Sequence, residues 1–326
     1  MEVPHSLPLL RHQFLQKATN YSIYLFFFSL GLIFNSCSSA RSDDFVLLQT
    51  SSPYDFHTIE EYEGTLYASG GDIWNKSNLV TSIDGSQWKT DSLTNKSIFD
   101  LYTYDQTLYG VGNDGYIFSG DPDLKLTRTK FWGLLRAFTS SNKGFIAAGG
   151  KDFNKGWLYK VNSNLLIDTA FYFKNEILDV SCSSNGMCIA CGYGLILTSN
   201  DAGNSWLRSP EIGDYYNSIG LNQKEEFFIV GYNGTIIRSK DKGESWTKLK
   251  NGHSPLANNK PFRTIKFKGE VGIITGDNGL IWISHNSGMV WEDISINTDM
   301  DIFDFTFFQS SIICVSEAGQ LFNVKI

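Results

Sequence analysis

The sequence has few charged residues, and acidic side chains outnumber basic ones among them. Charged residues make up 19% of the 326 residues, far fewer than in a disordered tail. The formal net charge is −7, and without residues 1–36 it is −8, from 25 basic and 33 acidic side chains. Binding to a phosphate backbone requires a dense Lys/Arg surface. The composition therefore argues against a disordered chain and against a nucleic-acid-binding protein.

Signals for helices are also nearly absent from the sequence. Gly (30 residues), Ser, Asn, Thr, Tyr and Phe dominate instead, which favours many short strands joined by tight turns. With 42% apolar and 14% aromatic residues, the chain is still able to bury a sizeable core. We therefore expect an all-β protein.

The apolar run YSIYLFFFSLGLIF, residues 21–34, is too short to cross a membrane. As a helix it would span roughly 21 Å, against about 30 Å of hydrocarbon. Arg11 and Lys17 precede it, so residues 1–36 are predicted to be a signal peptide with residues 21–34 as its hydrophobic region.

Cys37 directly follows this run and is flanked by small polar residues. The arrangement resembles the lipobox of bacterial lipoproteins, in the looser form seen in Bacteroidota. The resemblance implies that Cys37 is lipidated, that residues 37–44 are a tether, and that the cell envelope is the site of action. Ordinary cleavage near Ser39, with loss of Cys37, is the alternative. Both interpretations place residues 45–326 outside the cytoplasm.

Seven segments of the chain align with one another at a period of about forty residues. They end at Gly70, Gly112, Gly149, Gly192, Gly231, Gly276 and Ser316, with steps of 42, 37, 43, 39, 45 and 40. Each unit contains an alternating strand, a more continuously apolar strand, a Gly-containing turn and a third strand, and most continue to a fourth. Repeated four-stranded antiparallel units predict a seven-bladed β-propeller.

Closure of the predicted ring depends on the first strand of the domain. The seventh unit ends at GQLFNVKI, after its third strand. Residues 45–50, FVLLQT, precede the first unit and have no other partner. We therefore predict that residues 45–50 supply the fourth strand of the last blade.

Four polar loops recur at one place in the predicted blades: SIDGSQW, SNDAGNSW, SKDKGESW and SHNSGMVW. They resemble Asp-box (BNR) repeats, in which Ser and Asp cap backbone N–H groups, Gly takes a positive φ and Trp anchors the next strand. The predicted structural residues are Ser82, Asp84, Trp88, Ser199, Asp201, Gly203, Trp206, Ser239, Asp241, Gly243, Trp246, Ser284, Asn286, Gly288 and Trp291.

Stretches such as GYNGTIIRSKDKGESW, together with seven blades, resemble the photosystem II stability/assembly factor-like family. The resemblance covers residues 45–326 and is best in blades four to six. It implies a non-catalytic binding or assembly scaffold, without cofactor or metal, that recognises a protein of the envelope or membrane, or a glycan. We expect a monomer that contacts the membrane through its lipid anchor alone.

Asp boxes also occur in sialidases, so a glycan-binding or glycan-processing propeller is the alternative function. Sialidases require an arginine triad, a tyrosine nucleophile with an acidic partner, and a Phe/Tyr-Arg-Ile-Pro motif. PFRTI, residues 261–265, approaches that motif but lacks the final Pro, and Arg is scarce. The sequence therefore favours a non-catalytic protein.

Three cysteines, Cys182, Cys188 and Cys191, lie close together in the fourth unit. A zinc site would need a fourth ligand, and none is near in the sequence. We predict instead a disulfide between Cys182 and Cys188 that closes the first hairpin of this blade.

One column of the alignment is polar in every blade. It lies at the start of the innermost strand and comprises Thr58, Asp100, Arg136, Asp179, Ser218, Thr264 and Asp304. The preceding column adds His57, Asn217 and Arg263. In a propeller these positions encircle the central channel, so they form a candidate binding ring for a peptide, a glycan or a cation. The alternative is that the side chains cap loops or bond to the adjacent blade.

Overall fold

The computed structural model describes residues 45–72, 76–91, 96–120, 125–128, 132–210, 213–252 and 259–326. The predicted signal peptide, the tether of residues 37–44 and Cys37 lie outside these ranges. No helix among the described residues is long and apolar enough to span a membrane.

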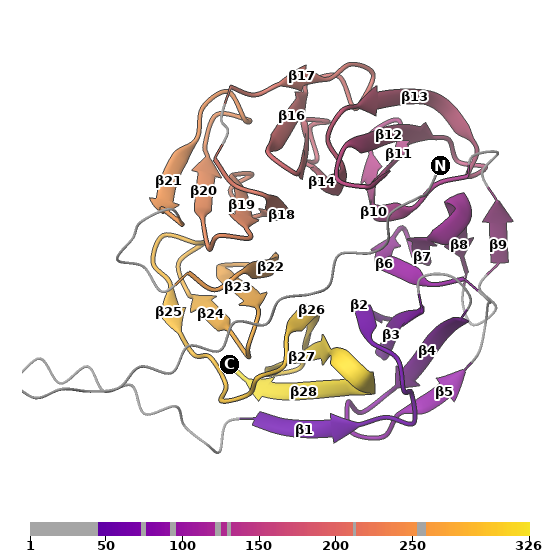
Figure 1. The fold of residues 1–326 in the computed structure, drawn as a ribbon, viewed down its shortest axis with the longest axis vertical. Helices are drawn as coiled ribbons and strands as arrows, with labels where there is room; N and C mark the ends of the chain where they lie inside the picture. The colour runs from indigo at the N-terminus through magenta and orange to yellow at the C-terminus, as the bar shows by residue number, and fades with distance from the viewer. Residues whose placement is uncertain are drawn as a thin grey trace, which may run out of the picture. The chain divides into compact units, whose positions relative to one another are not determined.

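The described residues form seven four-stranded antiparallel sheets arranged around a ring (Figure 1). Blade 1 contains β2 (Phe56–Tyr62), β3 (Thr65–Asp72), β4 (Lys76–Ser82) and β5 (Lys89–Asp91); blade 2 contains β6 (Ile98–Tyr104), β7 (Thr107–Gly112), β8 (Tyr116–Ser119) and β9 (Lys125–Arg128). Blade 3 contains β10 (Leu135–Ser141), β11 (Gly144–Lys151), β12 (Lys155–Val161) and β13 (Ile167–Phe173); blade 4 contains β14 (Ile177–Cys182), β15 (Cys188–Gly192), β16 (Leu195–Ser199) and β17 (Leu207–Arg208).

The remaining blades follow the same order. Blade 5 contains β18 (Tyr216–Leu221), β19 (Phe227–Gly231), β20 (Ile236–Ser239) and β21 (Thr247–Lys250); blade 6 contains β22 (Phe262–Lys268), β23 (Val271–Gly276), β24 (Ile281–Ser284) and β25 (Glu292–Asp293). Blade 7 contains β26 (Ile302–Phe308), β27 (Ser311–Ser316), β28 (Gln320–Lys325) and β1 (Phe45–Gln49). Short 3-10 turns at Asn113–Gly115 and Glu317–Gly319 join the second and third strands of blades 2 and 7. The predicted seven-bladed propeller is confirmed.

Strand β1 closes the ring, as the sequence predicts. It pairs antiparallel with β28, from Phe45 opposite Val324 to Gln49 opposite Gln320. Beyond the strand, the Thr50 hydroxyl donates to the Gly319 carbonyl at 2.8 Å. The two ends of the propeller domain are therefore held together within blade 7.

The hydrophobic core consists of seven clusters, and each lies between two adjacent blades. The second strand of a blade is enclosed by both neighbours, which explains why β15 and β19 are buried at every position. The fourth strand lies at the periphery, and both residues of β17 are exposed. The sequence pattern of alternating, continuously apolar and polar strands thus follows the radial position of each strand.

The Asp-box loops connect the third and fourth strands, on the side of the ring opposite the starts of the innermost strands. In blade 4 the Ser199 hydroxyl donates to Asp201 Oδ1 at 2.8 Å and accepts the Gly203 N–H at 2.9 Å. The same hydrogen bonds recur at Ser239–Asp241–Gly243, Ser284–Asn286–Gly288 and, in shorter form, Ser82–Asp84–Gly85. Four loops of different sequence therefore share one internal geometry.

Each box also joins its blade to the preceding one. Trp88, Trp206, Trp246 and Trp291 pack against the core cluster that their blade shares with the preceding blade. Gly203 has a φ of +80°, and a Cβ there would lie 2.6 Å from Ile146 Cδ1 of blade 3. Both the backbone conformation and the available space therefore require glycine at this position.

Blade 3 has a different loop at the position of the box. Asn162 Oδ1 accepts the N–H groups of Asn164 and Leu166, at 3.0 and 3.2 Å. Leu165 takes a positive φ of 60° and is buried in the core cluster between blades 2 and 3. An asparagine turn and a buried leucine thus occupy the place that Asp and Gly have in other blades.

Candidate functional site

Every innermost strand carries an irregularity at the same place, where it enters the central channel. The pairing register with the second strand shifts by one residue between the first and third strand positions in all seven blades. Such β-bulges re-aim side chains at the ends of sheets. The bulge produces two adjacent rings of side chains at this end of the channel.

We call the first ring the mouth ring, and all its members are half-buried. Its residues are His57, Phe99, Arg136, Leu178, Asn217, Arg263 and Phe303. The second ring, one residue further along, is called the clasp ring. Its residues are Thr58, Asp100, Ala137, Asp179, Ser218, Thr264 and Asp304.

The structure corrects the predicted position of Arg136. In blade 3 the clasp position is Ala137, which pairs with Ala148, whereas Arg136 lies at the bulge. The error arose because the apolar Ala137 resembles the first buried residue of the strand. Phe138 is instead the residue that packs in the core, at the position where the other blades place Ile, Leu, Val or Phe. The clasp ring is therefore polar in six blades rather than seven.

Most clasp-ring side chains accept a hydrogen bond from the backbone of the next blade. The donors and acceptors are Leu101 N–H to Thr58 Oγ1 (3.0 Å), Phe138 N–H to Asp100 Oδ2 (2.8 Å), Ile219 N–H to Asp179 Oδ2 (2.7 Å), Ile265 N–H to Ser218 Oγ (3.3 Å) and Ile59 N–H to Asp304 Oδ2 (3.1 Å). The Thr264 hydroxyl reaches blade 7 differently, by donating to the Phe303 carbonyl at 2.7 Å. These bonds fasten each blade to its neighbour.

Blade 3 shows what happens where the clasp oxygen is missing. Ala137 has no acceptor for the N–H of Val180 in blade 4. That N–H instead donates to Oδ1 of the adjacent Asp179, at 2.7 Å. Asp179 thus serves two backbone N–H groups, one in its own blade and one in blade 5.

Burial favours the protonated form of two clasp carboxyls, Asp100 and Asp179, by raising the pKa of each. It raises the pKa of Asp179 to about 6, although the N–H bonds from Ile219 and Val180 oppose the shift. It also raises the pKa of Asp100 well above its usual value, and the nearby Asp179 adds to the effect. A neutral carboxyl suits a structural acceptor better than a binding site for cations.

The mouth ring contains a stacked row of three side chains. The His57 and Phe99 rings lie parallel with centroids 4.7 Å apart, and the Arg136 guanidinium lies 5.8 Å from the Phe99 centroid. Arg136 Nε also donates to Glu176 Oε1 at 2.7 Å. Burial lowers the pKa of His57, which keeps this end of the row neutral.

Arg263 occupies the other side of the mouth ring. It pairs with Asp277 at 2.5 Å and with Asp301 at 3.3 Å. Its guanidinium lies 5.7 Å from the Phe303 ring centroid. Both mouth-ring arginines are therefore held by carboxylates and by aromatic rings.

The two rings open into a central cavity of about 560 Å³. Inside it, Lys266 Nζ lies 2.7 Å from Asp304 Oδ1 and donates to the Phe305 carbonyl at 2.8 Å. Burial raises the pKa of the nearby Glu60 to about 7, although Lys266 opposes this shift. The cavity is thus polar but internally paired.

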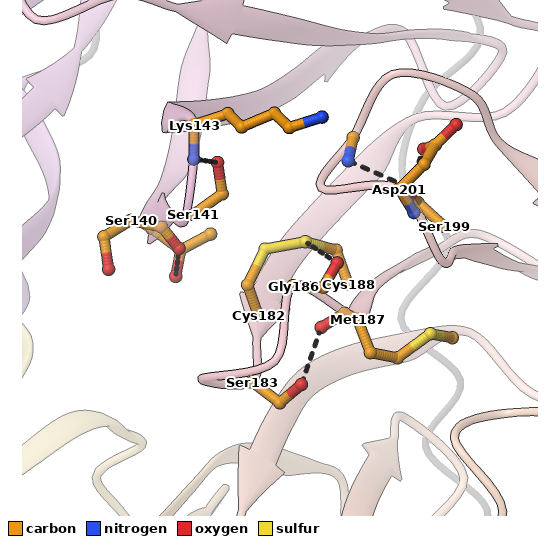
Figure 2. Close-up of a disulfide and its surroundings, with 12 residues drawn as sticks. Ser140, Ser141, Lys143, Cys182, Ser183, Gly186, Met187, Cys188, Ser199 and Asp201 are labelled. Atoms are coloured by element: carbon orange, nitrogen blue, oxygen red, sulfur yellow. Dashed lines mark hydrogen bonds between the residues drawn. A yellow bond between two sulfur atoms is a disulfide. The ribbon is translucent and has the colours of Figure 1, made fainter.

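Cys182 and Cys188 form a disulfide across the first hairpin of blade 4, and Figure 2 shows it beside the Ser183–Met187 turn. Cys191 and Cys314 are free and buried. In the described ranges, no three His, Cys, Asp or Glu side chains are grouped so that they could hold a metal ion.

The face that bears the mouth ring also carries aromatic side chains that we did not predict to form a site. Phe153 contacts Tyr193 with centroids 4.8 Å apart, and Tyr193 contacts Tyr215 at 5.3 Å. The Tyr232 N–H donates to the Tyr215 carbonyl at 2.8 Å. We call these four residues the aromatic arc. A usable sequence signal existed, because Tyr193 and Tyr232 each follow the glycine that ends a second strand.

Comparison with known proteins agrees with this architecture. Residues 211–301 match the family described as photosynthesis system II assembly factor YCF48. A search of curated proteins found no match in sequence. The solved structure of YCF48 bound to D1 peptide aligns with a TM-score of 0.63 at 14% identity, over 87% of this chain and 97% of that chain.

Two other solved structures are similar in fold. YCF48 from Cyanidioschyzon merolae aligns with a TM-score of 0.62 at 12% identity, over 86% of this chain and 98% of that chain. A catalytically inactive virginiamycin B lyase from Staphylococcus aureus, with quinupristin, gives 0.68 at 13% identity, over 86% and 99%. At these identities the likeness concerns the fold, and one similar propeller is an enzyme.

The matched family segment includes all strands of blades 5 and 6, which carry the GxxGxI pattern as GYNGTI and GDNGLI. The chain is a seven-bladed β-propeller, and its blades 5 and 6 contain a segment that is similar to the photosynthesis system II assembly factor YCF48 family.

Proposed function

We propose that this propeller is a non-catalytic scaffold of the cell envelope that binds a protein partner through the face bearing the mouth ring. The observation that carries the proposal is the composition of the mouth ring. It combines two arginines, a histidine, two phenylalanines, a leucine and an asparagine, all half-buried around one opening. Such mixed apolar and hydrogen-bonding groups suit recognition of a polypeptide.

The pairing of the charged groups supports binding rather than catalysis. Asp100 and Asp179 are occupied by backbone N–H groups, and Arg136 and Arg263 by carboxylates. A general acid or base needs to reach its substrate directly or through one water molecule. YCF48, a similar propeller, has been solved with a bound D1 peptide, which supports a peptide ligand.

The location in the envelope is the second part of the proposal. The apolar run of residues 21–34 and Cys37 favour a lipid-anchored protein, and the Cys182–Cys188 disulfide suits an oxidising compartment. Globomycin, which blocks lipoprotein signal cleavage, should cause an uncleaved precursor to accumulate in the native host. Normal maturation in its presence would contradict the lipid anchor.

Site-specific photocrosslinking tests the binding proposal. The photoreactive residue benzoylphenylalanine replaces Leu178 in the mouth ring of the full chain, and cells or native membranes are irradiated. The matched control carries the same residue at Val290, which is 66% exposed in the Asp-box loop of blade 6 on the opposite face.

We expect one defined protein adduct from Leu178 and none of the same mass from Val290. The adduct, identified by mass spectrometry, should then bind the purified full chain and compete with its own crosslinking. Equal labelling from both positions, or no adduct from the mouth, would contradict the proposal. Release of a fluorogenic sugar by the purified protein would instead support the glycan-processing alternative.

A further inference from the structure

The aromatic arc exposes more apolar surface than a solvated turn region requires. Phe153, Tyr215 and Tyr232 are 65%, 52% and 47% exposed. They come from blades 3 and 5 and are joined through the half-buried Tyr193 of blade 4. Adjacent exposed aromatic rings are typical of recognition surfaces, whereas single exposed apolar residues are common everywhere.

Phe153 is held in an unfavourable backbone conformation. Asp152 and Phe153 have φ values of +57° and +61°, a pair of conformations that tight turns usually assign to Asn and Gly. The corresponding turns of blades 4 to 7 use Gly194, Gly234, Gly279 and Gly319 at positive φ. A bulky residue in this region costs on the order of 1 kcal/mol or more. Because most of the Phe153 side chain is exposed, packing recovers little of this cost.

A buried carboxylate maintains this turn. Glu176 is 2% exposed, and its Oε2 accepts the Phe153 N–H at 3.1 Å. The Glu176 N–H donates to the Phe153 carbonyl, and its carbonyl accepts the Tyr193 N–H, both at 3.1 Å. Its other carboxylate oxygen binds Arg136 of the mouth ring. One residue therefore positions two residues of the arc and an arginine of the mouth: its side chain holds Phe153 and Arg136, and its backbone carbonyl holds Tyr193.

A second buried carboxylate has the same role in blade 5. Asp214 is 5% exposed, and its Oδ1 accepts the Tyr215 N–H at 2.7 Å and the Asn233 N–H at 3.0 Å. These bonds fix the turns that carry Tyr215 and Tyr232. Both ends of the arc are thus preorganised by buried acids, which lowers the entropy cost of binding.

Basic side chains of blades 3 and 4 lie at one end of the arc. Lys151, Lys155 and Lys174 are exposed beside Phe153, and within the described ranges they form no ion pair. The Arg208 guanidinium donates to the Gly194 carbonyl, next to Tyr193. Against these four cations, Asp152 is an exposed acid in the Phe153 turn, whereas Glu176 and Asp214 are buried. The arc is therefore a basic sector on an acidic protein.

We propose that the aromatic arc and its basic rim bind an extended peptide segment that alternates acidic with apolar side chains. This inference rests on the proposed function and names the ligand chemistry of the same face. The three contacting rings span at most about 10 Å, the length of roughly three residues of extended chain. The edge-to-face angles of 84° and 62° mean that the rings do not form one flat platform, so both ring edges and ring faces are presented to a ligand. Proline or leucine side chains pack on such aromatic surfaces, and the lysines provide partners for Glu or Asp.

Selection from a random heptapeptide phage library on the immobilised full chain tests this proposal. We expect enrichment of peptides that combine Asp or Glu with Leu, Phe or Pro. A fluorescein-labelled peptide from the enriched set then gives affinities by fluorescence anisotropy. Tyr215→Ala should weaken binding roughly tenfold. Lys151→Glu combined with Lys155→Glu should weaken it several-fold, and more at low salt than at high salt.

Matched controls lie on the Asp-box face. Ile83→Ala removes a side chain that is 78% exposed, and Lys240→Glu reverses an exposed lysine. Both should leave affinity unchanged. The melting temperatures of all variants should agree within a few degrees, which would show that a loss of binding does not result from a loss of folding. Tyr232→Ala is the substitute for Tyr215→Ala should that variant melt early.

Three outcomes would overturn the inference: no enriched sequence, enrichment of basic peptides, or binding that Tyr215→Ala leaves intact. Binding of oligosaccharides on a glycan array, lost in Tyr215→Ala, would reassign the arc to carbohydrate. If the Leu178 crosslink succeeds while the arc variants keep full affinity for the crosslinked partner, the proposed function stands and the arc inference fails.

Discussion

The two faces of the propeller use polar residues in opposite ways. On the Asp-box face, Ser, Asp or Asn, and Gly recur in four blades, and the hydrogen bonds of these Ser and Asp or Asn side chains remain inside the loop. On the mouth face the corresponding turns differ, with aromatic residues in blades 3 to 5 but Asp277 and Glu317 in blades 6 and 7. Repetition therefore marks the scaffold in this molecule, and departures from the repeat are the better guide to binding.

The mouth face itself contains two regions that differ in charge. Blades 3 to 5 carry the aromatic arc with its lysines, while Asp55 and Asp72 of blade 1 are exposed acids. Asp277 and Asp301 are held by Arg263, and Asp114 by Lys96. A ligand that approaches the mouth thus meets opposite charges on its two sides.

Deletion of Phe45–Gln49 should have the largest effect on the scaffold. It removes every pairing of β1 with β28 and leaves an open edge in blade 7. We expect the melting temperature to fall by roughly 10 °C or more, as a loss of several kcal/mol implies for a domain of this size. Differential scanning calorimetry measures the effect, and an unchanged melt would disprove closure by β1.

Two glycines allow two contributions to the free energy of unfolding to be measured separately: the strain of a positive φ and the steric contact between adjacent blades. Gly203 and Gly194 both have positive φ, but a Cβ at Gly203 meets Ile146 at 2.6 Å, whereas Gly194 has nothing within 4 Å. Gly194→Ala should cost about 1 kcal/mol, and Gly203→Ala about 1–3 kcal/mol more. Urea unfolding gives both values. Equal costs would show that the Asp-box loop does not fasten the blades.

The hydrogen bonds of the clasp ring predict different stabilities for two variants of Asp100. Asp100→Ala removes the acceptor of the Phe138 N–H and should cost about 1–3 kcal/mol. Asp100→Asn keeps a neutral acceptor oxygen and should cost clearly less. The matched Arg136→Ala variant breaks the ion pair with Glu176 at the mouth. If Asp100→Ala unfolds at the wild-type urea concentration, the carboxyl is free for a ligand.

Two groups of carboxyls should make the stability of the protein depend on pH in opposite directions: the buried carboxyls of the channel and the carboxylates of the Asp boxes. Burial raises the pKa of Glu60 to about 7 and that of Asp179 to about 6, so the folded state keeps protons that the unfolded chain has released. Stability should therefore fall as the pH rises from about 4 to 7. Glu60→Gln combined with Asp179→Asn should flatten this slope in thermal melts.

The Asp-box carboxylates affect the stability of the protein at lower pH. Hydrogen bonds from Gln87 and Ser86 lower the pKa of Asp84 to about 2. Although burial opposes the change, bonds from Ser205 and Ser199 lower the pKa of Asp201 to about 2 as well. The stability that these groups contribute is present above pH 4 and is lost as the pH falls toward 2. Asp84→Asn should reduce that acid loss but leave the slope above pH 5 unchanged.

The smallest expected change in stability belongs to the arc. Phe153→Gly relieves the positive φ and removes the contact with Tyr193, two effects of opposite sign. We expect a melting temperature within a few degrees of wild type and a roughly tenfold loss of the selected peptide. A marked fall in melting temperature would place Phe153 with the scaffold residues.

The fold was predictable because its period is long-range and redundant. Seven glycine- or serine-ended strands define the blades even where the Asp box is missing, and only residues 45–50 were left to close the ring. The register at Arg136 was misassigned because the clasp position of blade 3 is the apolar Ala137, which in sequence resembles the first buried residue of the strand.

The site was harder to predict than the fold. The sequence left open whether Asp100 and Asp179 bind a ligand or the adjacent blade, and only the N–H positions of the next blade show the second role. Phe153 and Tyr215 lie in turns that do not repeat, so a search for repeats passes over them. Each contacts Tyr193, so the arc depends on the closeness of turns from three different blades.

The pairing of β1 with β28 also has a consequence for the order in which the strands are synthesised and paired. During synthesis β1 is the first strand of the propeller to be made and its partner is the last; Thr50 and Gly319 are 269 positions apart in sequence. Six blades can form before β26, β27 and β28 are made, and during that interval β1 has no partner in its own chain. The β28 of another copy could then pair with this β1, so folding at low protein concentration favours the single-chain ring over an exchanged pair.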